Sequence, residues 1–211
     1  MPTGGPFPEG RGDLAGWSCK TRVVATFRPF ATERTWLVMP PPAESDAVLR
    51  YFERNRAHLE PWEPARPDTF YTQRFWRDRL IANRRELEQG AAMRLFAVSR
   101  GLPPQHPDRV IASCNFSNVV GGAFQACTLG YGLDHAQVGR GLMEEILRAA
   151  IPVAFETFRL HRIQANYQPV NERSGRLLRR LGFTVEGYAR DYLQIAGEWR
   201  DHVLTSITRP D

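Results

Sequence analysis

The chain has 211 residues, 42% of them hydrophobic and 24% charged, which excludes a disordered chain and predicts one soluble globular domain, alone or with an appendage. Its net charge of +5 is compatible with a nearby polyanion such as ribosomal RNA, but the 28 basic residues exceed the 23 acidic ones only mildly. Three cysteines without paired spacing argue against a zinc site or a disulfide framework, and the lack of a signal-peptide pattern or long apolar run predicts no membrane insertion.

The N-terminal segment begins with MPTGGPFPEGRG, a stretch rich in glycine and proline. We expect residues 1–31 to form a partly disordered extension ahead of a domain that spans residues 32–208. The segment RVVATFRPF within this extension is alternatively a short edge strand. The domain then begins with the strand ERTWLVMP, residues 33–40, which three consecutive prolines end.

Apolar residues at helical intervals predict two helices after this strand. The first helix covers about residues 45–59 and the second about residues 71–89. Between them, the prolines of the segment HLEPWEPARP exclude a regular helix and place Trp62 on a loop.

After the second helix the pattern changes to strands, with MRLFAVS at residues 93–99, RVIASCNFSNVV at residues 109–120 and FQACTLGYGL at residues 124–133. The pair Gly121-Gly122 predicts a tight hairpin turn. In the last strand, alternation places Gly130 and Gly132 on one face, which is nearly bare. A glycine inside a strand marks either a bulge or the close approach of a backbone or ligand, and the pattern leaves both open.

The stretch HAQVGRGLMEEIL, residues 135–147, places two glycines around an arginine directly before an amphipathic helical run. We expect a helix that begins near Gly139 and is kinked or broken at Pro152. Because the first-turn amides of a helix lack helical acceptors, Gly139, Arg140 and Gly141 predict a phosphate site, with a simple flexible turn as the alternative. The residues do not spell a P-loop or a dinucleotide fingerprint.

A further strand, HRIQANYQP from His161, a short helix, NERSGRLLRRLG, and the turn Gly182-Phe183 follow. The order LGYGL, VGRGLM, ANYQPVNERSGRLLRRLGF and EGYARDYL resembles that of the acyl-CoA N-acetyltransferases of the GNAT family. Within the family, HLEPWEP, NFSNVV and GEWRDHVLT are similar to the branch that acetylates the N-termini of ribosomal proteins. The resemblance covers about residues 33–207 and is densest after Val110.

This resemblance implies an α+β (mixed α/β) fold, in which helices flank a central mixed, mostly antiparallel sheet. The sheet is expected to splay in a V between two parallel strands at residues 127–133 and 161–168, and the pantetheine of acetyl-CoA to enter the gap as a substitute strand. The resemblance places pantetheine on the backbone of Tyr131, Gly132 and Leu133, where glycine leaves room for it.

The same resemblance places the CoA pyrophosphate on the main-chain amides of Val138, Gly139, Arg140, Gly141, Leu142 and Met143. The family's phosphate loop usually reads Gln/Arg-x-x-Gly-x-Gly/Ala, whereas this chain has Val138 in the first place and Met143 in the last. Because main-chain amides form the phosphate site, we expect these departures to weaken CoA binding and not to abolish it.

Asn171 and Ser174 match the family's Asn-x-x-Ser, in which the Asn holds pantetheine and the hydroxyl lies near the sulfur, so the resemblance makes them the catalytic residues. The alternative for Asn171 is an N-cap of the following helix, and the two roles are compatible. Some relatives carry a tyrosine general acid where this chain has Leu178, and others a glutamate base where it has Asn166. These departures move the chemistry to Ser174, and an α-amine with a pKa of about 8 needs no strong base.

An extended peptide N-terminus needs an aromatic wall, a carboxylate for its ammonium group and amide partners. Trp62, Glu63, Asn115 and Tyr167 are the candidates for this side of the site, with core packing as the alternative for Trp62. The five histidines are scattered and predict no metal site.

The sequence therefore predicts an acetyl-CoA-dependent N-acetyltransferase that acts on a protein α-amine, and the resemblance favours the N-terminal alanine of a small-subunit ribosomal protein. Two alternatives stay open: an acetyltransferase for a small amine such as an amino acid, polyamine or antibiotic, and an acyl-CoA-binding ribosome-assembly factor. We expect a cytoplasmic monomer or homodimer that needs no metal and works near the ribosome or its RNA.

Overall fold

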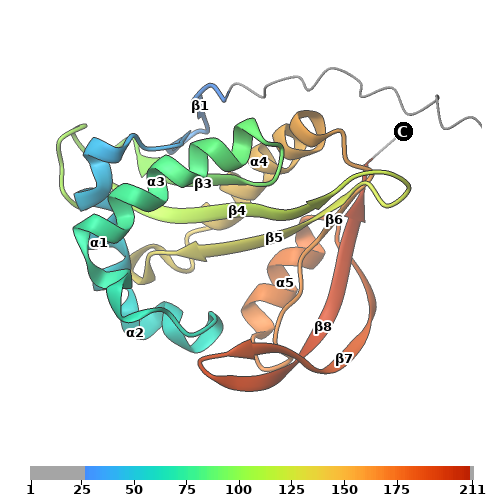
Figure 1. Cartoon of the computed structure of the whole chain (residues 1–211). Coiled ribbons are helices and arrows are strands. Elements are labelled where there is room, and N and C mark those ends of the chain that lie inside the picture. Colours follow the sequence, from blue (N-terminus) through green and yellow to red (C-terminus); the bar gives the residue numbers. More distant parts are fainter. Residues whose placement is uncertain (1–26, 210–211) are drawn as a thin grey trace, which may run out of the picture.

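One eight-stranded sheet organises residues 27–209, the part of the chain that the computed structural model describes (Figure 1). The order across the sheet is β1-β2-β3-β4-β5-β6-β8-β7, and neighbouring strands are antiparallel except β5 and β6, which are parallel. The strands are β1 Phe30–Ala31, β2 Thr35–Val38, β3 Met93–Ser99, β4 Val110–Val120, β5 Ala126–Leu133, β6 Arg162–Gln164, β7 Thr184–Ile195 and β8 Glu198–Thr208. The mixed, mostly antiparallel sheet expected from the sequence is confirmed.

Helices flank both faces of this sheet (Figure 1). They are α1 Ser45–Arg54, α2 Arg56–Leu59, α3 Gln73–Glu88, α4 Leu142–Phe158 and α5 Glu172–Arg180. Because neighbouring residues of a strand point to opposite sides, Phe96 of β3 packs with Trp76 and Leu80 of α3, whereas the adjacent Leu95 packs in a second cluster with Ile146 of α4. Among residues 27–209, no helix is long and apolar enough to cross a bilayer.

The N-terminal edge of the sheet is formed by the end of the predicted extension. β1 pairs with β2, with Phe30 opposite Leu37. The ring centroid of Phe27 lies 6.0 Å from that of Phe30, and both rings pack against the core. The segment RVVATFRPF, the alternative edge strand, therefore has only its last residue in β1 among the residues described, and residues 1–26 lie outside them.

Two helix predictions differ from the structure. The helix expected over residues 45–59 is interrupted at Asn55, which separates α1 from α2. The buried side chain of Asn55 donates a hydrogen bond to the carbonyl oxygen of Tyr51 at 2.8 Å, so it shares this acceptor with its own backbone amide, which lies at 3.3 Å. Pro152, expected to kink or break its helix, does not break it, because the residue lies inside α4, which continues to Phe158.

The loop between β4 and β5 is longer than the predicted two-residue turn. Val120 pairs with Ala126, so residues 121–125 all lie in the loop. Both Gly122 and Gln125 have positive φ angles, 68° and 42°, which reverse the chain over a wider arc than a two-residue turn.

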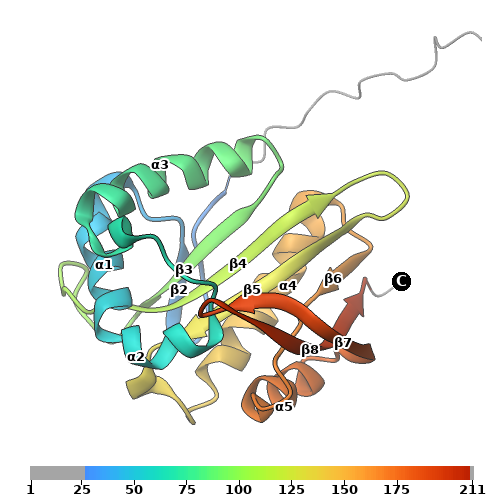
Figure 2. The ribbon, with the colours of Figure 1, turned by 60° about the horizontal axis from the view of Figure 1, so that its bottom comes forward.

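The parallel strands β5 and β6 diverge, as Figures 1 and 2 show. Their pairing ends at Thr128 and Gln164. β5 continues to Leu133 along β4, while the chain after β6 stays with β8. The backbone of residues 129–133 is therefore without a strand partner on its β6 side within the described chain, which is the expected V, although β6 is shorter than the strand predicted over residues 161–168.

Candidate functional site

The unpaired part of β5 carries Gly130 and Gly132, the two glycines predicted to share one face of the strand. A Cβ on Gly130 would meet no atom within 4 Å, which agrees with room for a ligand. A Cβ on Gly132 would lie 3.1 Å from Leu59 Cδ2 and 3.2 Å from the hydroxyl oxygen of Tyr51. The explanation of Gly132 is therefore corrected: this residue lacks a side chain because α1 and α2 pack against the strand there.

The loop that follows β5 exposes a row of main-chain amides. Gly139 and Gly141 have φ angles of 83° and 70°, a left-handed conformation that favours glycine. α4 begins at Leu142, and no described residue accepts a hydrogen bond from the amides of residues 139–144. The amide of Val138, by contrast, donates to the carbonyl oxygen of His135 at 3.3 Å. The unpartnered amides, at the positive end of a 17-residue helix, form a cradle for an anion.

Arg34 holds this cradle from the start of β2. Its Nη1 donates to the carbonyl oxygen of Arg140 at 2.9 Å, and its Nε donates to Glu145 Oε2 at 2.6 Å. Although burial acts to raise the pKa of Glu145, hydrogen bonds from Thr32 and Arg34 hold it below its ordinary value. No local sequence pattern indicates this role of Arg34, because 106 residues separate Arg34 from the carbonyl that it binds.

Asp134 anchors the junction between β5 and the loop. Its buried carboxylate accepts from Arg54 Nε at 2.6 Å, from Asn55 Nδ2 at 3.2 Å and from the amide of Ala136 at 3.0 Å. Burial acts to raise the pKa of Asp134, but the hydrogen bonds from Arg54 and Asn55 outweigh it and lower the pKa. Asn55 also accepts from the amide of His135 at 2.9 Å. Hydrogen bonds thus connect the α1–α2 break to the start of the phosphate loop. Of these features, the sequence could indicate only the capping position of Asp134 after a strand.

The first turn of α5 carries the two predicted catalytic residues. Asn171 Oδ1 accepts from the amide of Ser174 at 3.2 Å, so the N-cap role of Asn171 is observed. Ser174 Oγ lies 2.6 Å from the hydroxyl oxygen of Tyr131, on the unpaired part of β5. Burial raises the pKa of Tyr131 to about 12, so the phenol is protonated at neutral pH. Sequence reasoning used only the backbone of Tyr131 and missed this side-chain pair.

The segment that follows α2 meets the hairpin of β7 and β8 (Figure 2), and Trp62 and Glu63 belong to this segment. Trp62 ends a 3-10 turn and not a plain loop, and it is 40% exposed, which does not fit the core-packing alternative. The carbonyl oxygen of Glu63 accepts from the amide of Ala196, at the hairpin turn, at 3.0 Å. The carboxylate of Glu63 is paired with Arg66, so it would have to leave this partner to receive an ammonium group.

Asn115 and Tyr167 lie on opposite sides of the splay. Asn115 of β4 is paired with Gly130, so its partly buried side chain belongs to the strand pair that carries the open face. Tyr167 follows β6, and its ring atoms would lie 2.7 Å from a Cβ placed on Gly175. The ring therefore covers the first turn of α5, close to Ser174.

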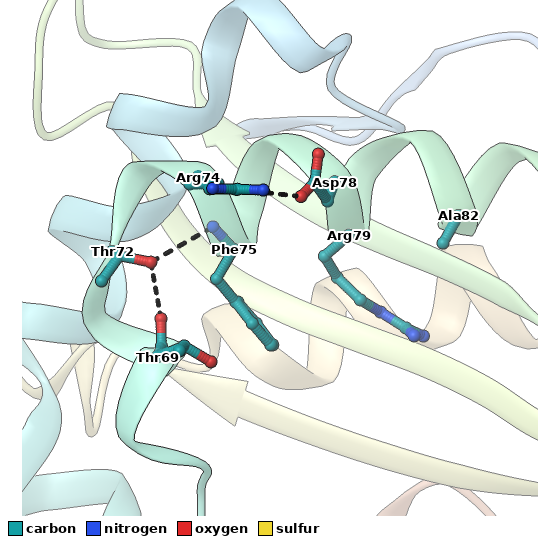
Figure 3. Close-up of a pocket in the computed structure, with 7 residues that line it drawn as sticks. All are labelled: Thr69, Thr72, Arg74, Phe75, Asp78, Arg79 and Ala82. Atoms are coloured by element: carbon teal, nitrogen blue, oxygen red, sulfur yellow. Dashed lines mark hydrogen bonds and ion pairs between the residues drawn. The ribbon is translucent and has the colours of Figure 1, made fainter.

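The surface has two hollows, one away from the predicted site and one beside it. One, of about 390 Å³, runs along α3 and is lined by Thr69, Thr72, Arg74, Phe75, Asp78, Arg79 and Ala82 (Figure 3). It contains none of the predicted site residues. The other, of about 540 Å³, includes Arg34, Gln137, Arg140 and Leu142 and so borders the amide cradle. Among residues 27–209, no three His, Cys, Asp or Glu side chains are grouped to hold a metal ion.

The splayed strands and the amide-lined loop agree with a known protein family. Residues 34–184 match the family described as an acetyltransferase (GNAT) domain. The chain belongs to the GNAT acetyltransferase family. This acetyltransferase is 48% identical over 161 residues to the ribosomal protein uS5-alanine N-acetyltransferase of Escherichia coli, which covers 76% of this chain and 80% of the relative. It is 34% identical over 168 residues to the probable N-acetyltransferase YjcK of Bacillus subtilis, covering 80% and 90% of the two chains.

Solved structures agree with this assignment. The ribosomal-protein-S5-alanine acetyltransferase of Vibrio fischeri has a TM-score of 0.80 and 34% identity, and the match covers 88% of this acetyltransferase and 98% of that chain. The structure of Mycobacterium smegmatis RimJ, in complex with a CoA-disulfide, has a TM-score of 0.74 and 25% identity, covering 86% and 90%. The family resemblance drawn from the sequence is confirmed.

Proposed function

We propose that this acetyltransferase transfers the acetyl group of acetyl-CoA to the N-terminal α-amine of a protein, with the N-terminal alanine of the small-subunit ribosomal protein uS5 as acceptor. One observation carries the donor half: the unpaired edge of β5 leads directly into a loop whose amides, at residues 139–144, have no acceptor within the described chain. The acceptor follows from the 48% identity to the uS5-alanine enzyme of Escherichia coli.

In this proposal the backbone of Tyr131, Gly132 and Leu133 receives pantetheine, because it is the part of β5 that lacks a β6 partner. The amides from Gly139 to Met143 receive the pyrophosphate, with the charge of Arg140 beside them. The amide of Val138, included in the sequence prediction, donates to the carbonyl oxygen of His135 and is therefore left out of the proposed phosphate donors. Asn171 supports pantetheine through its amide nitrogen while its oxygen caps α5.

The proposed reaction needs few catalytic side chains. An unperturbed α-amine has a pKa of about 8, so a useful fraction is neutral at pH 7 and can attack the thioester once it is positioned. Ser174 supplies a hydrogen bond for the departing thiolate. Trp62, Glu63, Asn115 and Tyr167 are proposed to receive the acceptor. Glu63 contacts the β7–β8 hairpin turn, Asn115 pairs with Gly130 of β5 and Tyr167 lies against the first turn of α5, which supports this proposal. The reaction is proposed to take place in the cytoplasm beside the ribosome, and monomer or homodimer stays a prediction.

Purified enzyme, acetyl-CoA and a synthetic peptide with the N-terminal sequence of uS5 test the proposal by mass spectrometry. We expect one acetyl group on the peptide and none on a matched peptide whose α-amine is already blocked. Intact masses of ribosomal proteins from cells with and without the gene extend the test. Unmodified peptide together with acetylated small amines would favour a small-molecule acceptor. Unchanged masses with impaired subunit assembly would favour the assembly-factor alternative.

A further inference from the structure

The hydroxyl groups of Tyr131 and Ser174 form a bridge across the splay. Their oxygens are 2.6 Å apart, at the short end of the O–H···O range. We infer that Tyr131 is a positioning residue, which fixes the Ser174 hydroxyl as a hydrogen-bond donor to the sulfur of the CoA leaving group. This inference rests on the proposed function.

Both partners of the bridge are fixed by the fold. Tyr131 lies beyond Thr128, the last residue of β5 that pairs with β6, and its backbone is paired with Cys114 of β4. Ser174 lies in the first turn of α5, where Asn171 accepts its backbone amide. The bridge therefore joins the arm made by β5 to the arm made by β6 and α5, at the place where the strands separate.

The direction of the hydrogen bond follows from the donors available. Each hydroxyl has one hydrogen, and a serine oxygen accepts up to two hydrogen bonds. The phenol is the more acidic group and the better donor, and the described chain offers its hydrogen no acceptor besides Ser174. When Tyr131 donates to Ser174, the serine hydrogen is directed away from the tyrosine. A serine without this partner would rotate among its staggered positions.

Tyr131 holds its proton throughout the reaction. Its pKa of about 12, raised by burial, exceeds the ordinary value of about 8.5 for a thiol by several units, so transfer of the phenolic proton to the thiolate is uphill. The N–C bond forms as the C–S bond breaks, the amine proton leaves to water, and the thiolate takes its proton from water after release. Ser174 stabilises that thiolate while Tyr131 holds Ser174. Leu178, where some relatives carry a tyrosine, is buried and cannot donate.

The test uses bound CoA, so it has a readout independent of acetyl transfer. Tyr131→Phe keeps the ring and removes only the hydroxyl. The apparent pKa of the bound CoA thiol is obtained from the pH dependence of its alkylation by iodoacetamide, read as the mass of the CoA adduct. A hydrogen-bond donor to the thiolate lowers the pKa of the thiol. Because Tyr131→Phe releases the Ser174 donor, we expect the thiol pKa to rise by about one unit, a tenfold change, in this variant. We expect Ser174→Ala to raise it similarly, and the double variant to raise it no further than either alone.

Steady-state kinetics provide the second readout. We expect kcat of Tyr131→Phe to fall about tenfold with little change in the KM for acetyl-CoA, because the hydrogen bond that Tyr131 positions, from Ser174 to the sulfur, forms only as the thiolate develops. Tyr188→Phe, which removes an exposed phenol on β7, is the matched control and should change neither quantity. An unchanged thiol pKa in Tyr131→Phe, or fully additive losses in the double variant, overturns the inference while CoA binding stays intact. Wild-type protein that binds no CoA in calorimetry overturns the proposed function itself.

Discussion

The guanidinium of Arg34 and the carbonyl oxygen of Arg140 are hydrogen-bonded at 2.9 Å, which joins the start of β2 to the middle of the phosphate loop. This hydrogen bond engages the carbonyl of Arg140, whereas the amides of residues 139–144 have no acceptor within the described chain. The same guanidinium is fixed by Glu145, in the first turn of α4. The shape of the cradle thus depends on a residue that does not belong to it.

Arg34→Gln should weaken CoA binding about tenfold, because the loop loses a charge-assisted hydrogen bond that selects its conformation. Calorimetric titration with CoA measures the effect. Arg50→Gln is the control, since Arg50 forms an exposed pair with Asp46 on α1, outside the site. Equal CoA affinity for Arg34→Gln and wild type would show that the loop holds its conformation unaided.

Gly141→Val should also weaken CoA binding, by at least about tenfold. A side chain at a φ of 70° costs roughly 1–2 kcal/mol, which shifts the loop away from the conformation that presents its amides, and a β-branched side chain is the least tolerant of it. Gly121→Val serves as the control, because a Cβ there meets no atom within 4 Å and the residue is not in the left-handed region. If both variants bind CoA as the wild type does, the amides at residues 139–144 are not the phosphate site.

Asp134→Asn should lower the free energy of unfolding by about 2 kcal/mol at pH 7, because the buried charge-assisted bonds to Arg54 and Asn55 are weakened. Since the folded-state pKa of Asp134 lies below its ordinary value, its stabilising contribution is complete above about pH 4 and is lost as the pH falls through the lowered pKa.

Urea denaturation at pH 7 and at about pH 3 therefore measures this effect, and the difference in stability between the wild type and Asp134→Asn should be smaller at the lower pH. The control is Asp46→Asn, which alters an exposed pair with Arg50 and should change stability by less than about 1 kcal/mol. A constant difference between wild type and Asp134→Asn at both pH values would contradict the role given to the carboxylate.

Gly175→Ala should destabilise the protein by about 1–3 kcal/mol and lower kcat, because a Cβ there would lie 2.7 Å from the ring of Tyr167 and displace the first turn of α5. Gly130→Ala meets no atom within 4 Å and should leave the melting temperature unchanged. Thermal unfolding and steady-state kinetics distinguish the two. A stable and fully active Gly175→Ala would mean that Tyr167 moves aside without cost.

The local elements of the site were predictable from the sequence. β3 has the predicted bounds, and the strand before the phosphate loop and the helix after it are present. Pro152 gave a misleading signal, because its ring is exposed while Ile151 and Ala154 on either side are buried. Packing of those neighbours outweighs the roughly 3 kcal/mol that a proline costs inside a helix.

The contacts that complete the site were not predictable. Asn55 is hydrogen-bonded to Asp134 and His135, although 79 and 80 residues separate it from them in the chain. Helical periodicity across residues 45–59 therefore indicated a continuous helix, whereas this distant carboxylate and amide hold a break. Tyr131 and Ser174 are likewise brought together by the sheet and α5, so neither residue's neighbours in the sequence indicated the pair.

The position of β8 has a consequence for the assembly of the site. β8 lies between β6 and β7, so without it β7 has no strand partner and β6 keeps only β5. The second arm of the splay is therefore completed by residues 198–208, which are distant in sequence from the phosphate loop. We expect removal of β8 to abolish acetyl transfer, even though β1 to β5 and their sequence motifs remain intact.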